Sequence, residues 1–214
     1  VQESCGITLI GGDVSSNFSL FDLFVKLLAH SAYGSQTFLF VLGNHEFWEF
    51  PDLSVEHITD KYRKLLEEHG MYLLQNDLFY KNEFDDMGII PYAELEQMTN
   101  AELTERLRCS RLVVFGGTGF SGCNVEFNAN NGIYWNTVDR ETEIQESKKF
   151  DNLYQKLLPV LDQKNTVIFT HTPQKDWSSN PKSHAKFVYV SGHTHRNVFY
   201  DDGEERIYAD NQIG

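Results

Sequence analysis

The amino-acid sequence predicts an α/β fold in which helices pack on a central β-sheet. Short apolar runs, typical of buried strands, alternate with longer stretches of helical periodicity. Polar motifs directly follow several of these runs, and open α/β sheets place ligand sites outside the carboxyl ends of their strands. The 214 residues fit one compact domain, and we expect its functional side chains to meet at one edge of the sheet.

The expected elements follow one another regularly along the chain. The strands expected from apolar runs are 7–10, 38–42, 72–74, 112–115, 167–170 and 187–190, then a hairpin of 198–200 and 206–209 around Asp201-Asp202-Gly203. The expected helices are 20–30, 55–69 and 141–158. The acidic stretch at about 82–110 is expected to be a helical insertion, because Thr99 and Glu102 have the spacing of a capping box.

The composition of the chain indicates which binding partners and which cellular compartment to expect. The formal net charge is −13, from 31 acidic and 18 basic residues, and a surface this negative disfavours binding to nucleic acid. Three cysteines without paired spacing are typical of a reducing compartment, so we expect a cytoplasmic protein. No apolar run approaches the length of about 20 residues that a membrane span needs, and the N-terminus lacks the pattern of a secretory leader.

Five residues at strand ends are candidate metal ligands. Asp13 follows the strand 7–10, Asn44 follows 38–42, His171 follows 167–170, and His193 and His195 follow 187–190. Carboxylate, amide oxygen and imidazole together suit manganese, iron, zinc or magnesium better than a thiolate-bound metal. Each motif alone is common, and Gly12-Asp13 is by itself an ordinary turn. Their occurrence together, each at a strand end, favours one shared site.

With these residues in place, the sequence resembles the calcineurin-like metallophosphoesterases. The resemblance rests on Gly12-Asp13, Gly43-Asn44-His45-Glu46, the lone His171 and Gly192-His193-Thr194-His195. It implies a layered sandwich of β-sheets flanked by helices, with two divalent metal ions. It further implies that Asp13 bridges the ions, that Asn44, His171 and His193 complete one site, and that His195 serves the other. His45 would contact the phosphate and protonate the leaving group.

The sequence departs from the family pattern at the first motif. In the family, an Asp-x-His precedes Gly-Asp and completes the site that His195 serves, whereas residues 1–12 hold neither Asp nor His. Three explanations stay open: a chain truncated at its N-terminus, a single-metal or inactive relative, or ligands from another segment. We prefer truncation, because loss of a central strand would leave backbone groups unpaired. The serine/threonine protein phosphatases of this family carry Arg before Gly-Asn-His-Glu and Asp three residues after the Gly-Asp aspartate. Here those positions are Leu42 and Ser16, which argues against the protein-phosphatase branch.

Two functions therefore remain in competition. The first is hydrolysis of a phosphomonoester or phosphodiester through a metal-bound hydroxide, acting on a small phosphorylated substrate. The second is a non-catalytic binding module with an incomplete metal site. A nuclease is a weaker third, which the net charge disfavours. The substrate contacts suggested by the sequence are Asn124, Asn128, Asn130, Asn131, Tyr134, Trp135, Lys175 and Trp177, although a solvated loop explains the first six equally well.

Overall fold

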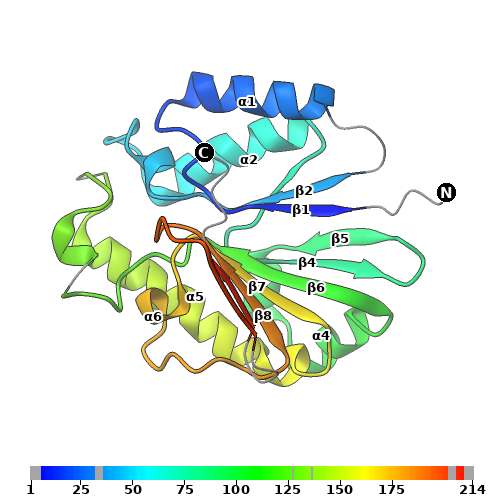
Figure 1. Ribbon diagram of the computed structural model, residues 1–214. Helices are drawn as coiled ribbons and strands as arrows, with labels where there is room; N and C mark the ends of the chain where they lie inside the picture. The colour runs from blue at the N-terminus through cyan, green and yellow to red at the C-terminus, as the bar shows by residue number, and fades with distance from the viewer. Residues whose placement is uncertain (1–5, 32–35, 127, 136, 202–205, 210–214) are drawn as a thin grey trace.

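The protein folds into four layers, in the order helix, sheet, sheet, helix (Figure 1). The computed structural model describes residues 6–31, 36–126, 128–135, 137–201 and 206–209. Helices α1 (Phe18–Ser31) and α2 (Val55–Glu68) cover the outer face of a three-stranded sheet. Helix α5 (Arg140–Leu161), with the short α3 (Tyr92–Gln97) and α4 (Asn100–Arg106), covers a seven-stranded sheet. The layered sandwich with flanking helices is thus confirmed.

The three-stranded sheet is parallel throughout. Its strands are β1 (Ile7–Ile10), β2 (Thr37–Phe40) and β3 (Tyr72–Leu73), and they are hydrogen-bonded in that order. Since β1 and β2 run parallel, the segments that follow them leave the sheet at the same edge. That edge carries Asp13 and Asn44.

The seven-stranded sheet has the order β5-β4-β6-β7-β8-β10-β9. Its strands are β4 (Asp77–Asn82), β5 (Met87–Ile90), β6 (Ser110–Gly117), β7 (Thr166–Thr170), β8 (Phe187–Ser191), β9 (Val198–Asp201) and β10 (Arg206–Ala209). Strands β6, β7, β8 and β10 are parallel neighbours, and β4, β5 and β9 pair antiparallel. The carboxyl ends of β7 and β8 therefore also share an edge.

Alternating side chains along the strands divide the core between the layers. On β2, Phe38 and Phe40 pack toward α1 and α2, whereas Leu39 points to the opposite face and joins Val114 and Phe169 from the second sheet. This period of two is what a strand buried on both faces requires. The interleaved apolar cluster fixes the two sheets against each other, and so fixes the distance between the loops at their ends.

The helix ends follow the chemistry of their sequences. Ser54 caps α2 by accepting from the N–H of His57, and Asp139 caps α5 by accepting from the N–H of Thr142. The capping box expected at Thr99 and Glu102 is present at the start of α4. None of the described helices is long and apolar enough to cross a membrane.

Several expected boundaries change. Strand β2 ends at Phe40, before the expected Leu42, and β6 extends to Gly117 instead of ending at Phe115. The stretch at 82–110 is helical only in α3 and α4, because residues 87–90 form β5 and pair with β4. That the stretch at about 82–110 is an insertion within a single domain stays a prediction. The hairpin of β9 and β10 is confirmed, but Asp202 and Gly203 of its expected turn lie outside the described residues.

Candidate metal centre

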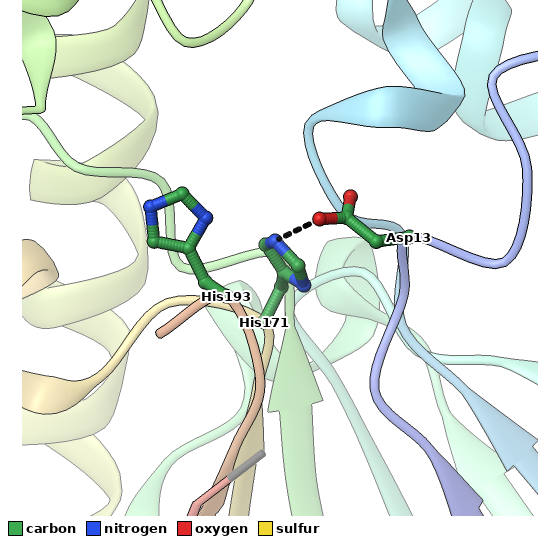
Figure 2. Close-up of side chains that lie close together, drawn as sticks. All are labelled: Asp13, His171 and His193. Atoms are coloured by element: carbon green, nitrogen blue, oxygen red, sulfur yellow. Dashed lines mark ion pairs between the residues drawn. The ribbon is translucent and has the colours of Figure 1, made fainter. Parts of the chain in front are cut away.

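Four loops at the carboxyl ends of β1, β2, β7 and β8 meet between the two sheets. They bring Asp13, His171 and His193 together, with one ligand atom from each lying within 4.8 Å of the others. Figure 2 shows the Asp13 carboxylate directed at the His171 ring, with the His193 ring beside it. The distance between Asp13 Oδ2 and His171 Nε2 is 3.4 Å. The sequence placed these residues at strand ends, and the structure gathers them at one point.

The hydrogen bond of His171 fixes which of its nitrogens faces the cluster. Nδ1 lies 2.6 Å from the carbonyl oxygen of Gly11, which can only accept, so Nδ1 carries the hydrogen. In the neutral imidazole Nε2 then presents its lone pair. That lone pair points at Asp13, and His171 is 1% exposed, so water has little access to it. A metal-ligating histidine has this arrangement, with the second nitrogen held by a carbonyl.

The side-chain amide of Asn44 adds a further acceptor. Its Nδ2 donates to the carbonyl oxygen of Ile133 at 2.9 Å, which directs Oδ1 inward. Oδ1 lies 3.1 Å from His171 Nε2 and 3.2 Å from His193 Nδ1. Carboxylate, amide oxygen and imidazole lone pairs facing one another are mutually repulsive unless a cation lies between them. The residues present therefore fit a divalent metal ion.

The imidazole of His193 is suited to ligation at neutral pH. The pKa of His193 is lowered to about 4, chiefly by burial and also by the nearby positive charge that His171 can carry, while Asp13 opposes the shift. The ring is thus neutral near pH 7 and offers its nitrogens as ligands. The backbone of His193 is left-handed, with φ of 69°, an unusual conformation for a bulky residue. This conformation sits in the turn that carries the ring to the cluster.

His195 stands apart from this cluster. It is exposed, has a left-handed backbone with φ of 53°, and is not among the residues whose ligand atoms lie within 4.8 Å of one another. Its charge nevertheless influences the pKa values of His45 and His193, so it lies at the rim. The structure thus brings together Asp13, Asn44, His171 and His193, and leaves His195 outside that group.

His45 lies next to Asp13 on the solvent side. Its backbone N–H donates to Asp13 Oδ1 at 3.0 Å, and its Nε2 lies 3.8 Å from Asp13 Oδ2. Partial burial lowers the pKa of His45, Asp13 raises it, and His171 and His195 lower it. The ring is also stacked on Trp48, with 3.8 Å between ring centroids. A half-exposed imidazole beside the cluster can reach a bound ligand and exchange a proton with it.

Glu46 is the functional residue that sequence reasoning missed. Its fully buried carboxylate accepts hydrogen bonds from the backbone N–H groups of Asp13, Val14, Ser15 and Gly43, at 2.7–3.2 Å. Burial raises the pKa of Glu46, as does the nearby charge of Asp13. Glu46 thus joins the loop after β1 to the loop after β2. The signal in the sequence was an acidic residue directly after Gly-Asn-His.

The same two loops touch through glycine. A Cβ on Gly43 would lie 2.2 Å from Asp13 Oδ1 and 2.7 Å from His171 Cε1. A Cβ on Gly12, whose φ is +86°, would lie 2.3 Å from the nitrogen of Gly43. Only a residue without a side chain allows this approach. The two glycines therefore set the distance between Asp13 and Asn44.

Several residues that the sequence suggested as substrate contacts are instead buried or hydrogen-bonded within the fold. Asn124 and Asn128 donate to the buried carboxylate of Asp176 at 2.6 and 2.7 Å, which holds the loop between β6 and α5. Trp177 is fully buried in the core against α5, and Tyr134 is buried among the residues under α1 and α2. These four are structural. The structure leaves Asn130, Asn131, Lys175 and Trp135 exposed.

Comparison with known proteins agrees with this geometry. The model of the calcineurin-like phosphoesterase family matches residues 3–197, so the chain belongs to that family, a family of hydrolases that generally bind divalent metal ions. A similar solved structure is the crystal structure of phosphopantetheinyl hydrolase from Mycobacterium tuberculosis. The TM-score is 0.55 at 13% identity, over 95% of this chain and 77% of that chain, which is a likeness of fold. No curated protein matches the sequence.

Proposed function

We propose that this protein hydrolyses a phosphomonoester or phosphodiester of a small phosphorylated substrate with the help of two divalent metal ions. The observation that carries the proposal is the set of facing acceptors: Asn44 Oδ1 lies 3.1 Å from His171 Nε2, and Asp13 Oδ2 lies 3.4 Å from the same nitrogen. When bound, divalent ions offset phosphate charge and lower the pKa of water toward about 7. Manganese, iron, zinc and magnesium all suit this ligand set.

Each residue has a distinct part in the proposed reaction. Asn44, His171 and His193 would hold one ion, Asp13 would contribute to both ion sites, and His195 would serve the second site from the rim. His45 binds the phosphate and donates a proton to the departing oxygen. Its ring, half-exposed and beside Asp13, supports this role. The free thiols of Cys109 and Cys123 support our proposal that the protein is cytoplasmic.

Hydrolysis of nitrophenyl phosphate with added manganese tests the proposal. We expect activity that a chelator abolishes and that Asp13→Asn lowers by at least about 100-fold, because the neutral amide holds cations less strongly. Asp60→Asn is the matched control, since Asp60 is an exposed carboxylate on α2. Full activity in the presence of chelator would contradict metal dependence.

His45 can be tested separately through the leaving group. Nitrophenolate departs without a proton, whereas an alkoxide needs one. We therefore expect His45→Ala to slow the hydrolysis of an alkyl phosphate far more than that of nitrophenyl phosphate. Equal losses for both esters would contradict proton donation by His45.

Metal content separates the proposed enzyme from a binding module. Two ions per chain with hydrolysis support the proposal. Bound metal without hydrolysis of any phosphate ester would favour the non-catalytic module, and the position of His195 outside the cluster is the observation that keeps this alternative in view.

A further inference from the structure

A ladder of stacked rings leads outward from the metal centre. The His45 and Trp48 ring centroids are 3.8 Å apart, with an angle of 28° between the planes. Trp48 and Trp135 are 4.2 Å apart and nearly parallel, at 3°. We call the rings of His45, Trp48 and Trp135 the ring ladder. Its inner end is the imidazole beside Asp13, and its outer end is Trp135.

The outer end of the ladder is open to solvent. Trp135 is 67% exposed, although its neighbour Tyr134 is buried in the core. An indole left this exposed forgoes much of the stabilisation that burial of its apolar surface would give. Trp135 also has a left-handed backbone, with φ of 48°, which is an outlier for a bulky residue, and such outliers cluster at functional sites.

One backbone carbonyl aligns the ladder with the metal ligands. The oxygen of Ile133 accepts from Asn44 Nδ2 at 2.9 Å and from Trp48 Nε1 at 2.7 Å. The group that directs Asn44 Oδ1 toward the histidines therefore also fixes the plane of the Trp48 ring. A ligand with its phosphate at Asp13 and its ester group against the ladder would meet both parts in a fixed relation.

We propose that the ring ladder binds the ester group of the substrate, and that this group is a planar aromatic ring such as a nucleobase or an aryl ring. The proposal rests on the phosphoesterase function proposed above and names the substrate class for the same site. His45 and Trp135 already cover the two faces of Trp48, so the outer face of Trp135 is the surface in this stack on which a planar ring can bind, with little demand for specific hydrogen bonds. Trp135 is then the specificity-determining residue, because its ring is the exposed end of the stack.

Binding of uncleavable ligands tests this directly. Phosphonate analogues of adenosine monophosphate and of ribose 5-phosphate, in which a carbon replaces the ester oxygen, carry the same anion with and without a base. By calorimetry with manganese present, we expect the adenosine analogue to bind at least about tenfold more tightly. We expect Trp135→Ala to bring the ratio of the two dissociation constants close to one, and Trp135→Phe to restore most of it.

Matched controls separate stacking from a general disturbance. Phe84→Ala removes an equally exposed aromatic ring, 72% accessible, from the turn between β4 and β5, and should leave the ratio unchanged. The phosphonate analogue of phenyl phosphate shows whether a simple aryl ring is enough. Equal affinities for the adenosine and ribose analogues, or a ratio that Trp135→Ala does not change, would overturn the proposal.

The binding ratio also distinguishes failure of this proposal from failure of the proposed function. A preference for the base that depends on Trp135, in a protein that cleaves no phosphate ester, would refute catalysis and keep the ring ladder. Metal-dependent cleavage by a protein that binds both analogues equally would refute the ring ladder and keep catalysis.

Discussion

The Asp13 and Asn44 side of the candidate metal centre, which the three-stranded sheet provides, differs from the His171 and His193 side in how its residues are held. On the first side, the Glu46 carboxylate gathers four backbone N–H groups from two loops. On the second side, main-chain groups hold His171 in place. Gly192 N donates to His171 O at 2.9 Å, and the carbonyl oxygen of Gly11 accepts from His171 Nδ1.

This difference indicates which side of the centre is more sensitive to substitution. The second side directly follows strands β7 and β8 of the seven-stranded sheet. Its backbone is therefore held by many hydrogen bonds between strands, and no single side chain determines its position. The first side depends on one carboxylate and on the contact between Gly12 and Gly43. Single substitutions should therefore damage the first side far more than the second.

Glu46→Ala should have the largest effect. It leaves four N–H groups beneath the centre without their acceptor, and we expect it to lower the free energy of unfolding by at least about 3 kcal/mol. Glu46→Gln should cost less, because one oxygen remains to accept. Urea unfolding measures both, with Glu68→Ala on the exposed end of α2 as control. An Ala variant within about 0.5 kcal/mol of the unchanged protein would refute the comparison.

Gly43→Ala should break the contact between the two sides. The added methyl group would overlap Asp13 and His171, so we expect hydrolysis to fall by at least about 100-fold, as misplaced catalytic groups commonly cause. Gly11→Ala is the matched control, since the nearest atoms to a Cβ there are 3.9 Å away. Similar rates for the two variants would show that the close approach is unimportant.

His193→Ala and His195→Ala sharpen the picture of the second side. His193 lies within the cluster and His195 does not, so we expect loss of His193 to weaken manganese binding by about tenfold or more and loss of His195 to weaken it less. Calorimetric titration with manganese gives both affinities. The reverse order would show that the ion sits at the rim.

Glu143→Gln tests the loop between β6 and α5 that adjoins both sides. Burial raises the pKa of Glu143 to about 7, while the N–H of Ser121 opposes the shift. Because the folded-state pKa lies above the ordinary value, the stability due to protonated Glu143 is complete below about pH 4.5 and is lost as pH rises through about 7.

A glutamine side chain at this position cannot ionise, so the Glu143→Gln substitution should remove that loss. We expect the variant to gain up to about 3 kcal/mol over the unchanged protein on going from pH 5 to pH 8, measured by urea unfolding. Glu141→Gln, on the exposed side of the same helix end, should show no such gain. A Glu143→Gln variant with the same pH dependence as the unchanged protein would contradict the raised pKa.

The sequence predicted the layers and most residues of the candidate metal centre because those depend on local patterns. Apolar runs located β1, β2, β7 and β8, and the polar residue after each run located Asp13, Asn44, His171 and His193. Strands β4 and β5 were both missed. Met87-Gly88-Ile89-Ile90 is short and contains glycine, and its strand conformation depends on pairing with β4. Glu46 and the ring ladder were missed because each joins loops that are distant in sequence.

The burial of Trp177 could not be foreseen for the same reason. A tryptophan near a site motif is as compatible with substrate contact as with packing, and only its position against Phe150 and Tyr154 decides between them. Local sequence thus predicts which residues reach the centre, while long-range contacts determine how they are held.

The most direct test of the centre is the protonation of His171 observed by NMR during a titration with zinc, which is diamagnetic. Correlation of ring protons with ring nitrogens, assigned with His171→Gln, reports on each nitrogen separately. We predict that Nδ1 carries the hydrogen, that Nε2 carries none, and that zinc shifts the Nε2 signal while Nδ1 stays bonded to Gly11. A protonated Nε2 whose signal zinc leaves unchanged would contradict a metal site at Asp13, Asn44, His171 and His193.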